Sequence, residues 1–261
     1  MNFDLVLAGV GGQGVLSMAY VIDNAAVDAG FHIKQPEVHG MAQRGGAISA
    51  YVRMSHGEVA SDIIPEGTAK AVLSVEPLEA LRYTKLLAPD GWVVTDVTPL
   101  VNMAGYPNPS ALFEVLFRLP RLVAVDATKL ALKAGAMKAQ NMVVVGAASA
   151  HLPVTREQLE AHVAGLFEKK GERLVKANLA AFRMGVAAGA MTDDLVKRGV
   201  PQAIAARVVP RLDFGPDKVP DVVVAAWAER LVRPDGAKVA AQLFHSRDVL
   251  ALDASIPGTL K

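Results

Sequence analysis

The sequence predicts an α/β fold: a mostly parallel, three-layer, Rossmann-like sheet with an antiparallel hairpin, followed by a C-terminal helical extension. Two observations predict it. Short apolar runs alternate with segments of helical periodicity along the first part of the chain. After residue 189, five prolines between positions 201 and 234 separate short helical segments. We therefore expect an α/β domain over residues 1–189 and a helical extension over residues 190–261.

Five apolar runs are predicted as strands. They cover residues 4–8, 47–54, 71–75, 91–95 and 122–126. In the second run, apolar side chains alternate with polar or aromatic ones, which is the period of a half-buried strand. His56 and Gly57 follow as a turn into residues 58–61, so we expect a hairpin there.

The predicted helices have recognisable ends. They cover residues 15–29, 77–87, 127–136, 142–151, 155–169, 172–188 and 220–232. The signals are a C-capping Gly30, Pro77 in a first turn, a capping Asp126, the Thr155–Gln158 capping box and a helix-breaking Gly171. Residues 142–151 are apolar nearly all round and are expected in the core, whereas the tail from residue 248 is expected to be extended.

Composition excludes several classes of function. Apolar residues make up 52% of the 261 residues and charged residues 20%, so the chain can bury a sizeable core. The net charge of +1 gives no general reason to bind nucleic acid or a membrane. The first residues run directly into a strand and do not resemble a signal peptide, so we expect a cytoplasmic protein.

The chain contains no cysteine. It therefore cannot form a disulfide, supply a thiolate nucleophile or ligate an iron–sulfur cluster through cysteine. Any such cluster in its function would have to be held by a partner.

A glycine-rich turn joins the first strand to the first helix. Gly9, Gly11 and Gly14 fit the G-x-G-x-x-G pattern, and Gly12 and Gln13 lie between them. The backbone of such a turn can approach a bound group closely, and the N–H groups of the following helix favour an anion. Gln13 places an amide at the start of the helix, where it can donate to an anion or to a neighbouring subunit.

Three interpretations of this turn remain open. A dinucleotide site needs a second apolar strand that ends in an acid about 20 residues on. Residues 31–37 are polar instead, and Pro36 precedes Glu37, the only candidate acid. A different phosphate-binding or subunit-interface role is favoured, and a purely structural turn is the third interpretation.

A second unusual segment covers residues 37–46. It holds the candidate functional residues His39, Gln43, Arg44, Gly45 and Gly46. Glycine allows close backbone approach, Arg44 offers a planar fork to a carboxylate or phosphate, and His39 can titrate near neutral pH. No second histidine accompanies His39, so we expect no metal site.

The remaining polar candidates carry weaker signals. His151, His162 and His245 are isolated on helical segments and are typical of core or surface residues. Asp96 and Asp126 end predicted strands, where they can contact a ligand or cap a helix or turn.

The two segments together, residues 5–14 and 36–46, resemble the gamma-type domain of the 2-oxoacid:ferredoxin oxidoreductase family. Within it, the run E-V-H-G-M-A-Q-R-G-G at 37–46 is most similar to the small (beta) subunits of the indolepyruvate branch. The resemblance covers about residues 1–187, so residues 1–189 are identified as a gamma-type domain. The extension at 190–261 has no counterpart in the short form of these subunits.

The resemblance implies an enzyme subunit that is not active alone. Thiamine diphosphate, Mg²⁺ and [4Fe-4S] clusters are expected on a large catalytic partner, coenzyme A is expected as co-substrate, and ferredoxin or another protein as electron acceptor. This chain also lacks the G-D-G…N-N pattern that holds thiamine diphosphate. We expect no nucleic-acid partner, no membrane and no metal or cofactor held by this chain alone.

The implied reaction is the oxidative decarboxylation of an arylpyruvate to arylacetyl-CoA and CO₂. His39 and Arg44 are assigned to the active site. The residues expected to bind the coenzyme are Gly9, Gly11, Gly12, Gln13, Gly14, Gln43, Gly45 and Gly46. The alternatives are a nicotinamide-dinucleotide-dependent dehydrogenase subunit and a purely structural assembly subunit.

Overall fold

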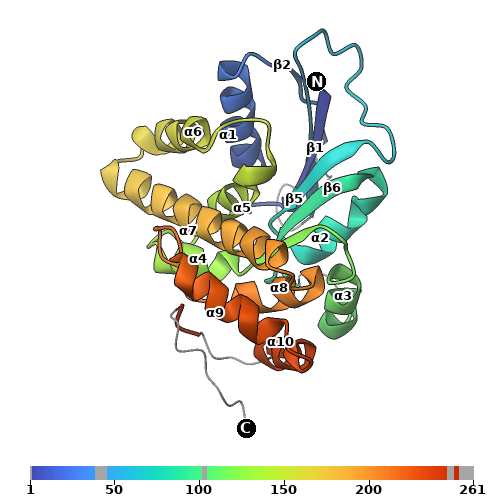
Figure 1. Cartoon of the computed structure of the whole chain (residues 1–261). Helices are drawn as coiled ribbons and strands as arrows, with labels where there is room; N and C mark the ends of the chain where they lie inside the picture. Colours follow the sequence, from blue (N-terminus) through green and yellow to red (C-terminus); the bar gives the residue numbers. More distant parts are fainter. Residues whose placement is uncertain (1, 39–45, 102–104, 246–249, 253–261) are drawn as a thin grey trace.

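The computed structural model describes residues 2–38, 46–101, 105–245 and 250–252 (Figure 1). Its centre is a seven-stranded sheet with the order β2-β4-β1-β5-β6-β7, and β3 also pairs with β4. The strands are β1 (Asn2–Val10), β2 (His32–Lys34), β3 (Glu37–Val38), β4 (Ala47–Ser55), β5 (Ala69–Ser74), β6 (Leu87–Asp96) and β7 (Leu122–Val125). Strands β1, β5, β6 and β7 are parallel, and β4 runs antiparallel to β1.

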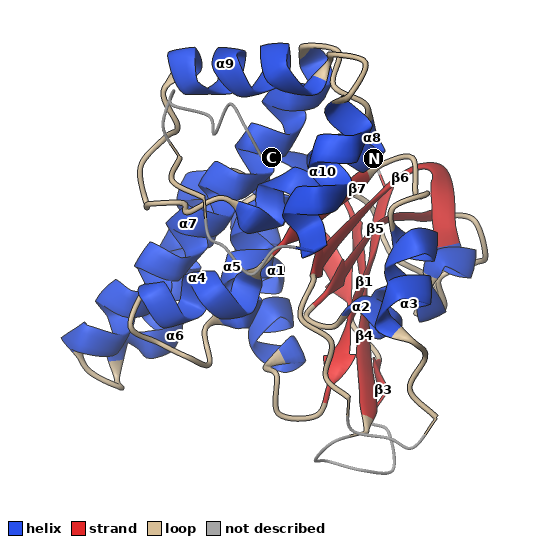
Figure 2. Cartoon of the chain, turned by 90° about the horizontal axis from the view of Figure 1, so that it is seen from below, coloured by secondary structure: helices blue, strands red, loops and turns tan. Residues whose placement is uncertain are grey.

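Helices cover both faces of the sheet (Figure 2). They are α1 (Val15–Asp28), α2 (Pro77–Arg82), α3 (Pro109–Leu116), α4 (Ala127–Lys133), α5 (Gln140–Ala148), α6 (Arg156–Glu168), α7 (Glu172–Lys197), α8 (Gln202–Val208), α9 (Asp221–Leu231) and α10 (Gly236–His245). Leu5 and Leu7 of β1 pack in the core with α1, α5 and α7, whereas Val6 packs on the opposite side with α2 and α3. The predicted three-layer α/β fold is confirmed.

The sequence predicted the wrong pairing partner for strand β4. Strand β4 does not pair with residues 58–61, which form no strand. It pairs instead with β1 over the whole register from Asn2 opposite Ser55 to Val10 opposite Ala47, and with β2 and β3 on its other side. β4 can pair with all nine residues of β1, whereas the chain bends directly after β4 and forms no strand beside it.

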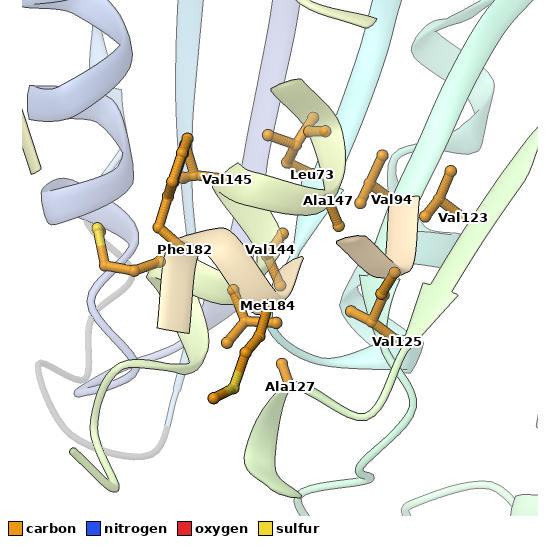
Figure 3. Packing of buried hydrophobic residues seen from close by; sticks show 14 of the residues in the cluster. Leu73, Val94, Val123, Val125, Ala127, Val144, Val145, Ala147, Phe182 and Met184 are labelled. Carbon is orange, nitrogen blue, oxygen red and sulfur yellow. The ribbon is translucent and has the colours of Figure 1, made fainter. Parts of the chain in front are cut away.

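Helices α5 and α7 pack with their backbones in contact, at the centre of the core (Figure 3). A Cβ added to Gly146 would lie 2.0 Å from the Phe182 carbonyl oxygen, and one added to Gly185 would lie 2.1 Å from the Val143 oxygen. These distances are far below van der Waals contact, so only glycine fits at either position. The apolar segment predicted as a core helix over 142–151 is confirmed as α5 up to Ala148, whereas residues 149–151 form a 3-10 turn outside the core.

The expected helix end at residue 188 is wrong, because α7 continues to Lys197. Gly189 does not break the helix. A Cβ there would lie 2.4 Å from the Ala147 oxygen of α5. Gly189 therefore belongs to the same close helix contact, and the division expected at 189/190 falls inside α7.

Helix α2 is shorter than predicted, since β6 already begins at Leu87. Pro89 and Asp90 lie within β6, where the pairing register with β5 shifts. The predicted caps are confirmed: the Asp126 side chain accepts a hydrogen bond from Lys129 N, and Thr155 and Gln158 form a capping box.

The C-terminal helices continue the helical layer beside β7. Gln202, at the start of α8, donates through Nε2 to the Leu122 carbonyl oxygen of that strand. Trp227 on α9 is fully buried. Of the tail that is expected to be extended, residues 250–252 are described, and Leu250 forms a parallel bridge with Leu212. None of the helices in the described ranges is long and apolar enough to cross a membrane.

Candidate functional site

The glycine turn lies at the carboxyl end of β1. Gln13 N donates to Val10 O at 3.0 Å, which closes a tight turn, and Gly12 in it has φ 98°. Gly14, with φ 82°, precedes the first residue of α1. Both positive φ values favour glycine, because an L side chain is strained there.

The side chain of Gln13 is bonded within the chain at both ends of its amide. Its Oε1 accepts from Val10 N at 2.8 Å, and its Nε2 donates to Val75 O at 3.0 Å. Gln13 therefore links the ends of β1 and β5. It holds the shape of the turn, and a second Nε2 hydrogen is left for any further contact.

The glycines of the turn differ in their surroundings. A Cβ on Gly9 would lie 2.4 Å from Val75 Cγ2, and one on Gly14 would lie 2.5 Å from Asn141 Nδ2. Gly12 is exposed, and a Cβ on it would meet nothing within 4 Å. Packing inside the protein thus requires Gly9 and Gly14, whereas Gly12 borders open space.

The second segment is held at both of its ends, by strand β4 at one and by the glycine turn at the other. Val38 of β3 pairs with Ser49 of β4, so residues 39–46 connect two paired strands. Gly11 N donates to Gly46 O at 2.8 Å, directly across from the glycine turn. Gly46 therefore adjoins Gly11 of the glycine turn, while His39, Gln43, Arg44 and Gly45 lie outside the described residues.

Two neighbouring helices begin at this site without a side-chain cap. Neither α1 nor α5 has an N-cap side chain that accepts a hydrogen bond, or an acidic residue in its first turn, and in α5 the Asn141 Oδ1 accepts from Met142 N at 2.9 Å. Buried Asn141 joins them, because its Nδ2 donates to Gly14 O at 3.1 Å. The first N–H groups of a helix lack intrahelical partners, so the positive ends of two helix dipoles meet here.

The sequence analysis missed Asn141. Its signal is faint: it is a polar residue at the start of an otherwise apolar helix. Its contact with Gly14, 127 positions away, follows only from the packing of α5 against the turn.

Carboxylates cap the starts of two other helices at this end of the sheet. Glu76 caps α2, and Asp126 caps α4. Asp96 accepts hydrogen bonds from Ala127 N and Thr98 N. Burial, and then the charge of Asp126, raise the pKa of Asp96 to about 7. The capping interpretation of Asp96 and Asp126 therefore accounts for their contacts.

The isolated histidines have ordinary partners. His151 stacks on Trp92 with ring centroids 3.8 Å apart, and His162 Nε2 lies 2.6 Å from Asp28 Oδ2. Among the described residues, no three histidine or acidic side chains are grouped in a way that could hold a metal ion.

The sheet topology is unlike that of a dinucleotide-binding fold beside the glycine turn. In such a fold, a parallel strand next to the first one ends in the acid that binds the ribose. Here the strand on that side of β1 is β4, which runs antiparallel. The chain after α1 leads to the short strands β2 and β3, which pair with β4 and not with β1.

Two solved structures of oxoacid oxidoreductases share this fold. The gamma subunit of keto/oxoacid ferredoxin oxidoreductase from Geobacter sulfurreducens superposes with a TM-score of 0.51 at 23% identity, over 71% of this chain and 94% of that chain. The 2-oxoglutarate:ferredoxin oxidoreductase from Magnetococcus marinus, solved with 2-oxoglutarate, coenzyme A and succinyl-CoA bound, superposes with a TM-score of 0.58 at 21% identity. That match covers 72% of this chain and 31% of the longer one.

The chain belongs to the pyruvate ferredoxin/flavodoxin oxidoreductase family, whose model matches residues 4–188. It is similar to indolepyruvate oxidoreductase subunit IorB of Methanothermobacter thermautotrophicus, with 37% identity over 73% of this chain and 99% of the relative. The IorB subunit of Archaeoglobus fulgidus is 36% identical over 71% of this chain and 94% of its own length. The expectation of a subunit of an oxidoreductase is confirmed, and residues after 188 lie outside the family match.

Proposed function

We propose that the chain is the small subunit of an arylpyruvate (indolepyruvate-type) 2-oxoacid:ferredoxin oxidoreductase and acts only with a larger subunit. An arylpyruvate and coenzyme A give arylacetyl-CoA, CO₂, a proton and two electrons, which pass to ferredoxin or another acceptor. The similarity to two IorB subunits supports the substrate class. We place the complex in the cytoplasm.

The larger subunit carries the redox and thiamine cofactors in this proposal. The chain has no cysteine for clusters, and its described residues group no metal ligands. Thiamine diphosphate, held with Mg²⁺ on the partner, supplies the electron sink for decarboxylation. This chain completes the active site and helps to bind coenzyme A.

The observation that carries the assignment of coenzyme A is the pair of uncapped helix starts at the glycine turn. Helices α1 and α5 direct their first N–H groups to the same edge, and exposed Gly12 leaves room for a bound group. Phosphate groups bind well to such helix starts, because the N–H groups and the helix dipoles favour negative charge. Gly12 is therefore the position at which a side chain would obstruct the phosphates.

Replacing Gly12 by alanine tests this assignment. In the assembled complex, Gly12→Ala should raise the KM for coenzyme A by about tenfold, because a methyl group then stands at the phosphate site. Strain at positive φ should lower the free energy of unfolding by only about 1 kcal/mol. Steady-state kinetics with arylpyruvate and a reducible dye would measure the first effect, and urea unfolding the second.

Gly30→Ala is the matched control. Gly30 follows the other end of α1, has φ 81° and, like Gly12, has nothing within 4 Å of an added Cβ. Gly30→Ala should lower the free energy of unfolding by the same amount and leave the KM for coenzyme A unchanged. Equal KM values for both variants would contradict the coenzyme site, and a Gly12→Ala chain that no longer binds its partner would favour the assembly function.

Arg44 is proposed to bind the carboxylate of the arylpyruvate or a phosphate of the coenzyme, with His39 and Gln43 lining the same opening. Its planar guanidinium suits either anion. Arg44→Ala should raise the KM for one of the two substrates by about ten- to hundredfold, as expected for the loss of a charge-assisted hydrogen bond. Arg44→Lys, which keeps the positive charge but loses the planar guanidinium, should raise the same KM by a smaller factor than Arg44→Ala. Unchanged kinetics for both substrates would exclude this role.

A further inference from the structure

A cleft of about 340 Å³ lies between α3, α8 and α10, which are not elements of the glycine turn. Helices α8 and α10 follow residue 188, where the family match ends. The cleft is therefore a feature that the C-terminal region adds to the family fold.

Three aromatic rings form one wall of the cleft. The Phe244 ring meets Phe113 at 4.9 Å and Phe117 at 4.8 Å between ring centroids, in both cases nearly edge to face. Phe117 and Phe244 are almost fully buried. The apolar residues that line the rest of the cleft are Ile204 and three small ones, Ala203, Ala237 and Ala241. Phe113 is half-buried, so a flat apolar group that enters the cleft can contact its ring and the small exposed part of Phe244.

Two guanidinium groups lie beside the aromatic wall: Arg211 is 5.1 Å from the centre of the Phe244 ring, and Arg207 lines the cleft itself. The Arg207 guanidinium lies 4.5 Å from the centre of the Phe117 ring, and its Nη1 donates to Ala203 O at 2.9 Å. Its nearest carboxylate, Glu114, is 3.5 Å away with a side chain that is 62% exposed. This ion pair is long and solvated, so an anion that enters the cleft can replace Glu114 at small cost. His245 lines the same cleft and offers a further hydrogen-bond donor.

We propose that this cleft binds a small aromatic carboxylate, with its ring against Phe113 and Phe244 and its carboxylate on Arg207. The volume suits an acid with one or two rings, and an apolar wall with few placed polar groups is typical of small-molecule sites. The proposal is independent of the proposed function, since it concerns α3, α8 and α10 and needs no partner subunit.

Calorimetric titration of the purified full chain with indole-3-acetate, without partner or coenzyme A, tests the proposal. Saturable binding with a dissociation constant of about 0.1–1 mM is expected for a ligand of this size. Indole-3-acetamide, which keeps the ring and loses the charge, should bind about tenfold more weakly. Hexanoate, which keeps the charge and loses the ring, should also bind more weakly. Failure to bind indole-3-acetate would overturn the proposal and leave the oxidoreductase function untouched.

Two variants locate the binding site. Arg207→Met should weaken binding about ten- to hundredfold, and Ala241→Phe should abolish it by filling the cleft from α10. The control is Arg121→Met, which removes a guanidinium 5.6 Å from the Trp92 ring and should leave binding unchanged. Thermal unfolding of each variant shows whether it is folded. Binding that survives Ala241→Phe in a folded chain would exclude this cleft.

Discussion

Gly185→Ala should lower the free energy of unfolding by about 3 kcal/mol or more. The added methyl group would lie 2.1 Å from the Val143 carbonyl oxygen, and backbone cannot move aside as a side chain can. Helices α5 and α7 would have to separate, although every residue of α5 after Gln140 is buried. Urea unfolding of the purified chain, followed by far-ultraviolet circular dichroism, measures the loss.

Gly165→Ala separates this contact from the general effect of the substitution. Gly165 also lies inside a helix, α6, but nothing is within 4 Å of an added Cβ. Alanine should stabilise the chain there by about 0.5–1 kcal/mol, because it favours the helix more than glycine does. If Gly185→Ala cost less than about 1 kcal/mol, the close backbone contact between α5 and α7 would be refuted.

Gln13→Ala should lower the free energy of unfolding by about 2–4 kcal/mol. It leaves Val10 N and Val75 O without the amide that joins them, and both residues are buried. Gln13→Glu should lower the free energy of unfolding by at least as much as Gln13→Ala. A carboxylate cannot donate a hydrogen bond to the Val75 oxygen, and the two oxygens repel each other. Chemical unfolding of both variants gives the losses.

Gln140→Ala is the comparison for Gln13. The Gln140 amide, at the start of α5, makes a single long hydrogen bond of 3.4 Å to Thr128. Its removal should cost less than about 1 kcal/mol. A Gln13→Ala chain of unchanged stability whose complex has a raised KM for coenzyme A would instead place the amide on the coenzyme.

The sequence was sufficient for elements whose signals are local. The five longer strands follow apolar runs, and the capping residues Asp126 and Thr155 mark real helix starts. The hairpin prediction failed because strand pairing depends on which distant strand offers the longer register. The helix expected to end before Gly189 continues because that glycine contacts Ala147, a reason that no local pattern contains.

The candidate site was predictable in part for the same reason. The glycines at 9, 11, 12 and 14 predict a turn. The second glycine-rich segment ends beside that turn, at Gly46. The internal bonds of Gln13 and the contact of Asn141 with Gly14 depend on packing between elements. They could not be derived from spacing along the chain.

Strand β7 is the last strand of the sheet, and α8 lies along it with Gln202 bonded to the Leu122 carbonyl oxygen. An uncovered outer strand offers its backbone to other chains and invites aggregation. The C-terminal helices thus cover one edge of the sheet. A chain that ended after α7, at Lys197, would leave the backbone groups of β7 free to pair with a neighbouring molecule, so we expect it to be less soluble than the full chain.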